Sequence, residues 1–323
     1  MTLDQIRIFI AVAERQHMTR AADALHLTQS TVSAAIRSLE LRHDVTLFHR
    51  VGRGIELTET GAIFLHEAKA VLSRAQAAEF TLSELGGLKR GTLSIQASQT
   101  IASYWIPRHL VSFKKAYPDI DVKLSVGNSA DTAQAVLAGV ADAGLVEGAI
   151  DHPALSKRTI AKDRLVIVVG NTHPWALSPP KDACALTATS WILREQGSGT
   201  RSEFESQLAT LGLNPNDLDV SFSLPSNEAV RAAVESGSGA TALSEFVVAG
   251  ALRSGTLRAV PLHLPERCFQ IIRHKERYAS KALETFIAMI KKATSERPAP
   301  PERISISTLR QMASNAERVA VGV

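Results

Sequence analysis

The sequence predicts a multidomain α+β chain with an N-terminal winged helix-turn-helix, a long coiled-coil linker helix and a C-terminal α/β part of two lobes. Three patterns predict this architecture. Residues 1–58 show short amphipathic helices and a hairpin, residues 59–90 show a heptad repeat, and residues 91–294 alternate strands with helices. Residues 295–323 form a Pro-containing tail. The length of 323 residues suits two domains or one large one.

Three helices are expected at the N-terminus. The first has an apolar face at helical spacing, made by Leu3, Ile6, Ile10 and Ala13. The second covers residues 19–25 with a cap at Thr19, and Thr28 caps a third that runs to about Arg42. The spacing i, i+4, i+7 predicts a buried stripe on the third helix: Val32, Ile36 and Leu39.

The second and third helices have the pattern of a helix-turn-helix, because a short turn separates them. The outer side of the third helix carries small polar or cationic residues: Thr28, Gln29, Ser30, Thr31, Ser33 and Arg37. Such compact donors and acceptors suit a helix that enters a DNA major groove about 12 Å wide. On the pattern alone, an ordinary helical hairpin with a solvated outer face remains the alternative.

A hairpin is expected next, with strands at 46–50 and 55–57 and a tight turn containing Gly52 and Gly54. Arg50 and Arg53 flank this turn and can reach a phosphate or a minor groove, as a wing does. Taken singly, an arginine at such a position is more often a solvated surface charge.

One long helix follows from residue 59. Its apolar residues are spaced alternately by four and three: Phe64, Ala68, Val71, Ala75, Ala78, Leu82 and Leu85. An unbroken heptad seam needs a partner helix, which predicts a homodimer through residues 59–88; the alternative is a surface helix packed on its own domain. The glycines of residues 86–91 end the helix and mark a hinge.

Beyond residue 91, apolar runs predict buried strands at 93–97, 122–126, 143–146 and 165–169. Helices at 101–116 and 130–138 separate the first three strands, which is typical of a parallel sheet. The alternation then repeats, with strands at 191–193 and 220–224 and near 241, 257 and 270, and with helices after Thr200, after Ser226 and at 280–293. Two such runs predict two small lobes.

Composition and motifs exclude several classes of protein. No apolar run could span a membrane, and the N-terminus lacks the features of a secretory signal, so a cytoplasmic location is expected. The two cysteines, Cys184 and Cys268, exclude a disulfide framework; buried or inert thiols are expected, with redox sensing the alternative. No catalytic, metal-binding or dinucleotide-binding motif is present, so no catalytic residue, metal or cofactor is expected.

Net charge says little about partners. The whole chain carries +4, and residues 1–90 contain 11 Lys and Arg against 10 Asp and Glu, a surplus of only +1. A polyanionic partner therefore has to be argued from where individual charges lie.

Three turns that follow predicted strands are rich in hydroxyl, amide or glycine residues: Ser98-Gln-Thr100, Gly127-Asn-Ser129 and Glu195-Gln-Gly-Ser-Gly-Thr-Arg201. The third leads into a helix, where Thr200 and Glu203 have the spacing of a capping box. Free N–H groups at helix starts favour an anion, and strand ends that meet at one crevice are where such sheets bind ligands. Any single turn of this type is usually structural. Three at equivalent positions make a ligand site and a structural role equally favoured.

Six segments of the first 61 residues carry a family resemblance: Phe9-Ile-Ala-Val-Ala-Glu14, Thr19-Arg-Ala-Ala-Asp-Ala-Leu25, Leu27-Thr-Gln-Ser-Thr-Val-Ser33, Ile36-Arg-Ser-Leu-Glu40, Leu47-Phe-His-Arg50 and Leu57-Thr-Glu-Thr-Gly61. Together they resemble the LysR-type transcriptional regulators. The rest of the chain, apart from the tail, matches in length and lobe pattern. Gly144-Leu-Val-Glu-Gly148 and Arg194-Glu-Gln-Gly-Ser-Gly-Thr-Arg201 resemble the branch with regulators of sulfur assimilation, sulfite response and carbon fixation.

The resemblance implies a dimerising linker helix and an effector domain like periplasmic binding proteins. It implies promoter DNA with an inverted-repeat site as a partner, a homotetramer built from two dimers, and RNA polymerase as a further candidate partner. It also implies a small effector, either an inorganic sulfur oxyanion or a small carboxylate. Its expected contacts lie between the lobes: Ser98, Thr100, Asn128, Glu147, Ser198, Gly199, Thr200 and Asn227.

Two residues depart from the family pattern. Ser30 stands where proline is common and Asp44 where glycine is common, and we expect altered detail with intact DNA binding. Glu147 does not fit a simple anion site, because an ionised carboxylate repels an anionic ligand. Glu147 is therefore expected either to bind a protonated or hydroxylated group of the ligand or to hold Arg194 in place. Arg201 pairs with the ligand or, preferably, with Glu203 or Glu205.

Two other classes of protein compete with this interpretation. One is a solute-binding protein or small-molecule enzyme with an accessory helical domain, although neither a signal peptide nor a catalytic cluster is visible. The other is an architectural DNA-binding protein indifferent to ligand, against which the three turns argue.

Overall fold

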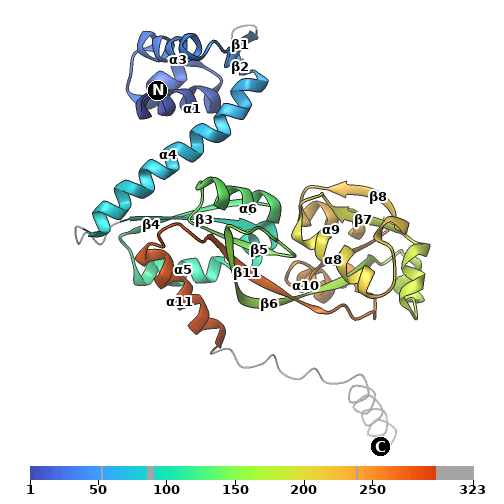
Figure 1. Cartoon of the computed structure of the whole chain (residues 1–323). Coiled ribbons are helices and arrows are strands. Elements are labelled where there is room, and N and C mark those ends of the chain that lie inside the picture. Colours follow the sequence, from blue (N-terminus) through green and yellow to red (C-terminus); the bar gives the residue numbers. More distant parts are fainter. Residues whose placement is uncertain (52–53, 86–90, 238, 296–323) are drawn as a thin grey trace, which may run out of the picture.

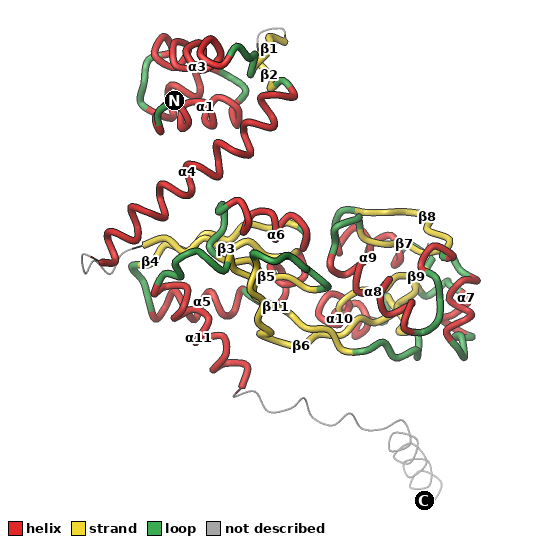
Figure 2. The backbone as a smooth tube through the Cα atoms, viewed as in Figure 1, coloured by secondary structure: helices red, strands yellow, loops and turns green. Residues whose placement is uncertain are grey.

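The computed structural model describes residues 1–51, 54–85, 91–237 and 239–295 (Figure 1). Arg53, the predicted hinge at 86–90 and the tail beyond residue 295 lie outside these residues. An N-terminal group of helices stands at one end of a long helix, and an α/β part of two lobes follows (Figures 1 and 2).

The N-terminal part contains three helices and a hairpin: α1 (Leu3–Arg15), α2 (Met18–Leu25), α3 (Gln29–His43), β1 (Phe48–Val51) and β2 (Gly54–Leu57). One apolar cluster joins them, and the predicted stripe on α3 belongs to it. Thr28 caps α3 as predicted, since its Oγ1 accepts the Thr31 N–H at 3.2 Å. The cap predicted at Thr19 is wrong. His17 holds an extended backbone before α2, and its Nδ1 accepts the Arg20 N–H at 3.4 Å.

The hairpin starts two residues later than predicted. Glu40 on α3 explains the shift, because its Oε1 accepts the N–H groups of Leu47 (2.8 Å) and Phe48 (3.3 Å). These bonds tie the start of β1 to α3 and not to β2, which pairs only with Phe48–Val51.

The long helix is α4 (Glu59–Leu85), a single helix as predicted. The first residues of its apolar seam, Phe64 and Ala68, pack into the N-terminal cluster. Val71 is 40% exposed one turn further on. The seam therefore serves its own domain at its start and leaves later apolar surface uncovered within this chain.

The first lobe holds three parallel strands, β3 (Gly91–Ser98), β4 (Ile120–Gly127) and β5 (Ala143–Glu147), with helices α6 (Ser129–Ala138) and α11 (Lys281–Ser295). The helix predicted at 101–116 is divided into a π-helical turn (Ile101–Trp105) and α5 (Pro107–Ala116). Pro107 has no N–H to continue a regular helix, and the Ile106 N–H bonds to Ile101 O at 2.9 Å.

The second lobe is built from strands β7 (Ser190–Arg194), β8 (Asp219–Leu224) and β9 (Ala240–Ser244) with helices α8 (Gly199–Thr210), α9 (Asn227–Glu235) and α10 (Glu245–Ser254). Shorter elements complete it: α7 (Pro174–Leu177), β10 (Leu257–Ala259) and 3-10 turns at Ala183–Ala188 and Pro215–Asp217. Each lobe has its own apolar cluster, one around Trp105 and Phe286, the other around Trp191 and Phe204.

Two long antiparallel strands connect the lobes, β6 (Leu155–Gly170) and β11 (Glu266–His274). The first half of β6 pairs with β11, and its second half pairs with β9 and β10 (Figure 1). Only the second half was predicted, at 165–169. The first half carries exposed cationic residues, so it shows no continuous apolar run.

Candidate nucleic-acid interface and interlobe site

The outer face of α3 is polar and open to solvent. Thr28, Gln29, Ser30, Thr31 and Arg37 are exposed, and Ser33 is partly exposed, whereas Val32 and Ile36 on the inner side are buried. Thr28 Oγ1 lies 2.9 Å from Ser30 Oγ and 2.8 Å from Thr31 Oγ1. The first turn thus presents a set of linked hydroxyls that can both donate and accept hydrogen bonds.

The C-terminal end of α3 explains one departure from the family pattern. Asp44 closes the helix with φ of 50° and ψ of 49°, in the left-handed region that favours glycine. Aspartate tolerates this region better than most residues, so the helix ends here without glycine. Ser30 lies in the first turn of α3, away from this end.

Of the two predicted wing arginines, the structure describes only Arg50. Arg50 is exposed on β1, beside the turn. Arg53 lies outside the described residues.

Glu147 lies where the two lobes meet. It ends β5 and is only 2% exposed. Ser98 of the first lobe donates a hydrogen bond from Oγ to Glu147 Oε2, and Thr200 of the second lobe donates one from Oγ1 to Oε1 at 3.4 Å. Residues of both lobes therefore bind one buried carboxylate.

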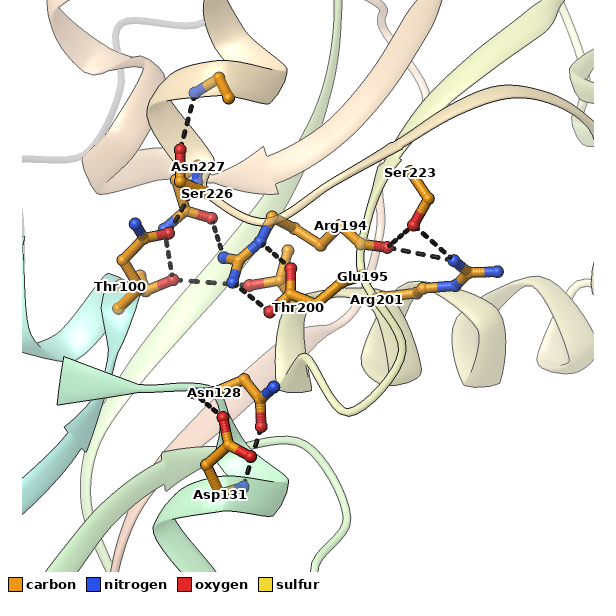
Figure 3. A network of polar contacts seen from close by, with 12 residues as sticks. Thr100, Asn128, Asp131, Arg194, Glu195, Thr200, Arg201, Ser223, Ser226 and Asn227 are labelled. Carbon is orange, nitrogen blue, oxygen red and sulfur yellow. Dashed lines mark hydrogen bonds and ion pairs between the residues drawn. The ribbon is translucent and has the colours of Figure 1, made fainter. Parts of the chain in front are cut away.

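Arg194 forms the second part of this interlobe network (Figure 3). Its Nε and Nη2 bind Glu195 at 2.8 and 2.9 Å, and its Nη1 donates to Asn227 Oδ1 at 2.6 Å. Asn227 Nδ2 in turn donates to Thr100 Oγ1 across the lobes at 3.1 Å. The alternative in which Glu147 braces Arg194 is wrong, because Glu195 holds that guanidinium.

Sequence reasoning missed a second buried arginine, Arg267 on β11, which is 2% exposed. Its Nε donates to Asp163 Oδ2 at 2.7 Å, and its Nη1 donates to Thr200 Oγ1 at 3.3 Å. Its Nη2 is also 2.7 Å from Asp163 Oδ2, so the two residues form a buried ion pair. The planar guanidinium carries five N–H donors, a geometry that suits carboxylates and other oxyanions.

The turn before α8 brings the lobes into direct contact. A Cβ on Gly199 would lie 1.9 Å from Glu147 O and 2.4 Å from Ser129 Oγ, so only glycine fits. The Ala130 N–H also donates to Gly197 O at 3.1 Å. These contacts show the two lobes closed on each other.

Other predicted residues take different roles. Asn128 caps α6 in a reciprocal pair with Asp131 and lies apart from Arg194 (Figure 3). Ser198 is buried at the start of α8 and makes no side-chain capping bond. The capping box of Thr200 and Glu203 is wrong, because the helix starts two residues earlier, with Ser198 as its N-cap, and Thr200 faces Glu147.

The structural pairing preferred for Arg201 is present. Its Nε donates to Glu205 Oε1 at 2.7 Å, four residues along α8. Its Nη1 also donates to the backbone oxygen of Arg194 at 3.1 Å, which fixes the end of β7 beside the site.

Tyr104 makes a further bond between the lobes. It lies in the π-helical turn and donates from Oη to Glu228 Oε1 on α9 at 2.8 Å. Burial and the neighbouring Glu228 raise the pKa of Tyr104 to about 12. The phenol is therefore a neutral donor throughout the physiological range.

Both cysteines are exposed, so of the expectation that they are buried or inert the first part is wrong, and inert thiols stay a prediction. Cys184 lies in a 3-10 turn, and Cys268 lies on β11. Neither takes part in the interlobe network. Among the described residues, no helix is both long and apolar enough to cross a lipid bilayer.

The α3 face and the interlobe network together define a ligand-responsive DNA-binding protein. Comparison with known families supports both halves: residues 3–62 match "Bacterial regulatory helix-turn-helix protein, lysR family", and residues 86–295 match "LysR substrate binding domain". The chain belongs to the LysR family of transcriptional regulators. It is a DNA-binding regulator with an effector-binding domain and not an enzyme, so the rival class of solute-binding protein or enzyme is not favoured.

Three curated relatives agree with the branch that the sequence resembles. The chain is 35% identical over 289 residues to the "Uncharacterized HTH-type transcriptional regulator YeiE" of Escherichia coli (strain K12), covering 89% of this chain and 96% of that protein. It is 32% identical over 290 residues to a "Probable RuBisCO transcriptional regulator" of Trichormus variabilis, covering 88% and 86%. It is 32% identical over 248 residues to "HTH-type transcriptional regulator CysL" of Bacillus subtilis (strain 168), covering 77% and 82%.

Solved structures share the fold. Full-length CbnR in complex with its target DNA has a TM-score of 0.67 and 22% identity, covering 91% of this chain and all of that one. The regulatory domain of CcmR from Synechocystis in complex with 2-PG has a TM-score of 0.59 and 24% identity, covering 65% of this chain and all of the other. The predicted architecture is thereby confirmed.

Proposed function

We propose that α3 lies in the major groove of promoter DNA and reads base edges with the polar face that starts at Thr28. The single observation that carries this is the exposure of that face opposite a buried apolar stripe. Gln29, Ser33 and Arg37 share this side of the helix at 3.6-residue spacing. Arg50 and Arg53 bind the backbone or the minor groove. That the CbnR structure contains target DNA supports this arrangement.

The DNA-binding unit is a dimer formed by α4. Val71, exposed on the heptad seam, gives a second copy apolar surface to cover. Two-fold symmetry then requires an inverted repeat with half-sites about 34 Å apart.

Two dimers join in a tetramer, with RNA polymerase a further partner. We place the functional divisions at 1–58, 59–90, 91–294 and 295–323, and the protein in the cytoplasm with its DNA.

The substitution Ser33→Glu tests the DNA interface. A carboxylate placed against the phosphates abolishes specific binding to duplexes selected by the wild type from a random pool. Ser38→Glu is the matched control, because Ser38 lies on the side of α3 that accepts a hydrogen bond from Gln5 on α1. A footprint of Ser33→Glu equal to the wild-type footprint overturns the assignment of α3.

The interlobe network binds a small anionic effector, an inorganic sulfur oxyanion or a small carboxylate. The support is chemical: Arg194 and Arg267 are buried there beside the hydroxyls of Ser98, Thr100 and Thr200, and helix α8 starts there. Ser198 and Gly199 add the N-terminal N–H groups of α8, Asn227 contributes its amide, and Asn128 lies at the edge beside Gly197. That the structure of the CcmR regulatory domain is a complex with 2-PG supports a small ligand in this domain.

Glu147 sets a condition on that effector. Its carboxylate already holds two hydroxyls, one from each lobe, that an oxyanion would use. An anion that enters the site therefore does one of two things. It carries a proton that it shares with Glu147, or it replaces Glu147 as the acceptor of the hydrogen bonds from Ser98 and Thr200. The effector then favours one arrangement of the lobes, and its influence on DNA binding can be no larger than its difference in affinity between the two arrangements.

Thermal unfolding of the full chain tests the anion site. The ligands are sulfite, sulfate, thiosulfate, phosphate and a panel of small carboxylates at fixed ionic strength. A ligand at 100 times its Kd adds about 2.7 kcal/mol to the free energy of unfolding of the folded domain that binds it. For a domain of this size, that raises the Tm by about 5–10 °C. The rise disappears in Thr100→Ala and Ser198→Ala and persists in Ser206→Ala, which alters an exposed hydroxyl of α8. No rise with any anion contradicts this effector class.

A further inference from the structure

A groove with a volume of about 370 Å³ lies between α11 and the strands β6 and β11 of the first lobe. The side of α11 that lines it carries Glu284, Ile287, Ala288 and Lys291, at helical spacing. None of the described residues that line this α11 groove takes part in the interlobe network. Its volume falls within the range of about 300–1,000 Å³ typical of small-molecule sites.

The strand register turns two arginines toward the α11 groove. Arg158 on β6 lies opposite Ile271 on β11, and Ser156 lies opposite Arg273. Opposite residues of an antiparallel pair share a face, and Ile271 is buried in the same apolar cluster as Leu283 of α11. Both arginines therefore stand on the face that α11 covers. They are diagonal neighbours across the pair, so their Cβ atoms lie within about 8 Å of each other.

Three cationic groups of the α11 groove are unpaired in the part of the chain that the structure describes. Arg158, Arg273 and Lys291 make neither an ion pair nor a side-chain hydrogen bond with any described residue. Like charges this close repel each other, so an anion bound between them stabilises the arrangement.

Two further charged residues line the α11 groove. Lys157 is already engaged, because its Nζ donates to Ile150 O at 2.8 Å and to Asp151 Oδ1 at 3.2 Å. Glu284 is exposed and is the one carboxylate in the described lining. One carboxylate therefore faces three unpaired cations, and the surplus favours an anionic ligand.

The floor of the α11 groove is apolar. Ile271 is 4% exposed, and Ala279 and Ile287 pack against the apolar cluster of the first lobe. A ligand that fills the groove thus buries an apolar part on this floor, beside the cationic groups.

We propose that the α11 groove binds a phosphate monoester, with its phosphate between Arg158, Arg273 and Lys291 and its apolar part against Ile271 and Ile287. A phosphate monoester carries a charge of about −1.5 to −2 at pH 7 and three acceptor oxygens, so it can accept hydrogen bonds from all three cations at once. A carboxylate has one charge and two oxygens. The planar fork of arginine also matches the geometry of phosphate. This site is separate from the interlobe anion site and stands or falls independently of it.

Calorimetric titration of the full chain with phenyl phosphate tests the proposal, in phosphate-free buffer at constant ionic strength. Two matched ligands test its parts: methyl phenyl phosphate, a diester with a single charge, and inorganic phosphate, which has no apolar part. Phenyl phosphate binds saturably. The diester binds about tenfold more weakly because a charged hydrogen bond is lost, and inorganic phosphate does so because no apolar surface is buried.

Variants of the two arginines locate the binding. Arg158→Gln and Arg273→Gln each weaken phenyl phosphate binding about tenfold. Arg253→Gln, the same exchange at an exposed position of α10, leaves it unchanged. Glu284→Gln removes the carboxylate of the groove and strengthens binding about two- to fivefold, a gain that a misfolded variant cannot produce.

Thr100→Ala separates this site from the interlobe site, where Thr100 Oγ1 accepts a hydrogen bond from Asn227, and it retains phenyl phosphate binding. The proposal is overturned by an absence of saturable binding, by binding that persists at full strength in both Arg158→Gln and Arg273→Gln, or by binding that Thr100→Ala abolishes. Inorganic phosphate that binds as tightly as phenyl phosphate overturns the assignment of a monoester.

Discussion

Gly61 is the residue at which the N-terminal domain leaves least room for a side chain. A Cβ there would lie 2.1 Å from Leu47 O and 2.9 Å from Leu57 Cδ2. Thr58 fixes the same junction, since its Oγ1 accepts the Gly61 N–H at 2.9 Å and donates to Thr46 O at 2.7 Å. The segment from Leu57 to Gly61 is thus the joint between the wing and α4.

Gly61→Ala therefore forces the backbone of the wing and α4 apart. We expect a loss of about 1–3 kcal/mol in the free energy of unfolding of this domain, the usual cost of overpacking. Amide hydrogen exchange in peptides from residues 1–60 measures it, because faster exchange reports easier opening. Gly250→Ala on α10 is the control, since a Cβ there meets nothing within 4 Å. If amide protection in residues 1–60 is the same in Gly61→Ala as in the wild type, the junction of the wing and α4 accommodates the added Cβ without loss of stability.

Single-residue roles were predictable where the signal is local. The cap at Thr28 and the outer face of α3 follow from spacing along one helix. Arg267 and Asp163 could not be found in this way, because they lie 104 positions apart and meet only through the pairing of β6 with β11. The cap at His17 was missed because a ring nitrogen replaces the usual hydroxyl.

At the scale of elements, strands and helices with a continuous apolar pattern were found, and interrupted ones were not. The first half of β6 is polar on its exposed side, and the helix at 101–116 hides a π-helical turn before Pro107. In both cases the interruption is local: exposed cationic residues break the apolar run of β6, and Pro107 has no N–H to continue a regular helix.

The short helix α7 depends on a neutral histidine. His173 caps it, with Nδ1 accepting the Trp175 N–H at 3.1 Å and Nε2 2.9 Å from Thr189 Oγ1. Burial lowers the pKa of His173 from its ordinary value of 6.5. A protonated Nδ1 cannot accept the bond, so the unfolded chain takes up this proton more readily. The stabilisation is fully present above the unfolded pKa and is lost as the pH falls through the window between the two pKa values.

Comparison with His173→Asn isolates this effect, because asparagine keeps a capping acceptor but cannot take a proton. We expect the wild-type Tm to fall more than the variant's between about pH 7.5 and pH 5.5. Tryptophan fluorescence follows it, since Trp175 and Trp191 belong to this lobe. Equal falls in the two proteins would show that His173 does not link protons to folding.

At the scale of the whole molecule, the order of domains was predictable, whereas the closed state of the lobes was not. The family segments at 9–61 indicated the DNA-binding end, and the strand–helix alternation indicated two lobes. Closure depends on Gly199 against Glu147 O and on Thr100 against Asn227, contacts between residues far apart in the chain. No periodicity along one segment encodes such a pairing.

Closure is also the property through which an effector can act on DNA. Gly199→Ala separates the lobes at their closest point, because its Cβ would overlap Glu147 O at 1.9 Å. We expect this variant to fold and to bind DNA, since Gly199 belongs to α8 of the second lobe, and α8 lies far from α3 (Figure 1). It should lose the response to any anion that works by favouring closed lobes.

The most direct measurement is the affinity of the full chain for a selected duplex, with and without the anion that raises its Tm, at constant ionic strength. Constant ionic strength is essential because phosphate contacts make all such affinities salt-dependent. We expect the anion to change the wild-type Kd for DNA by about fivefold or more and to leave that of Gly199→Ala unchanged. If an anion stabilises the wild type but alters neither its Kd for DNA nor its footprint, lobe closure does not couple the effector to DNA.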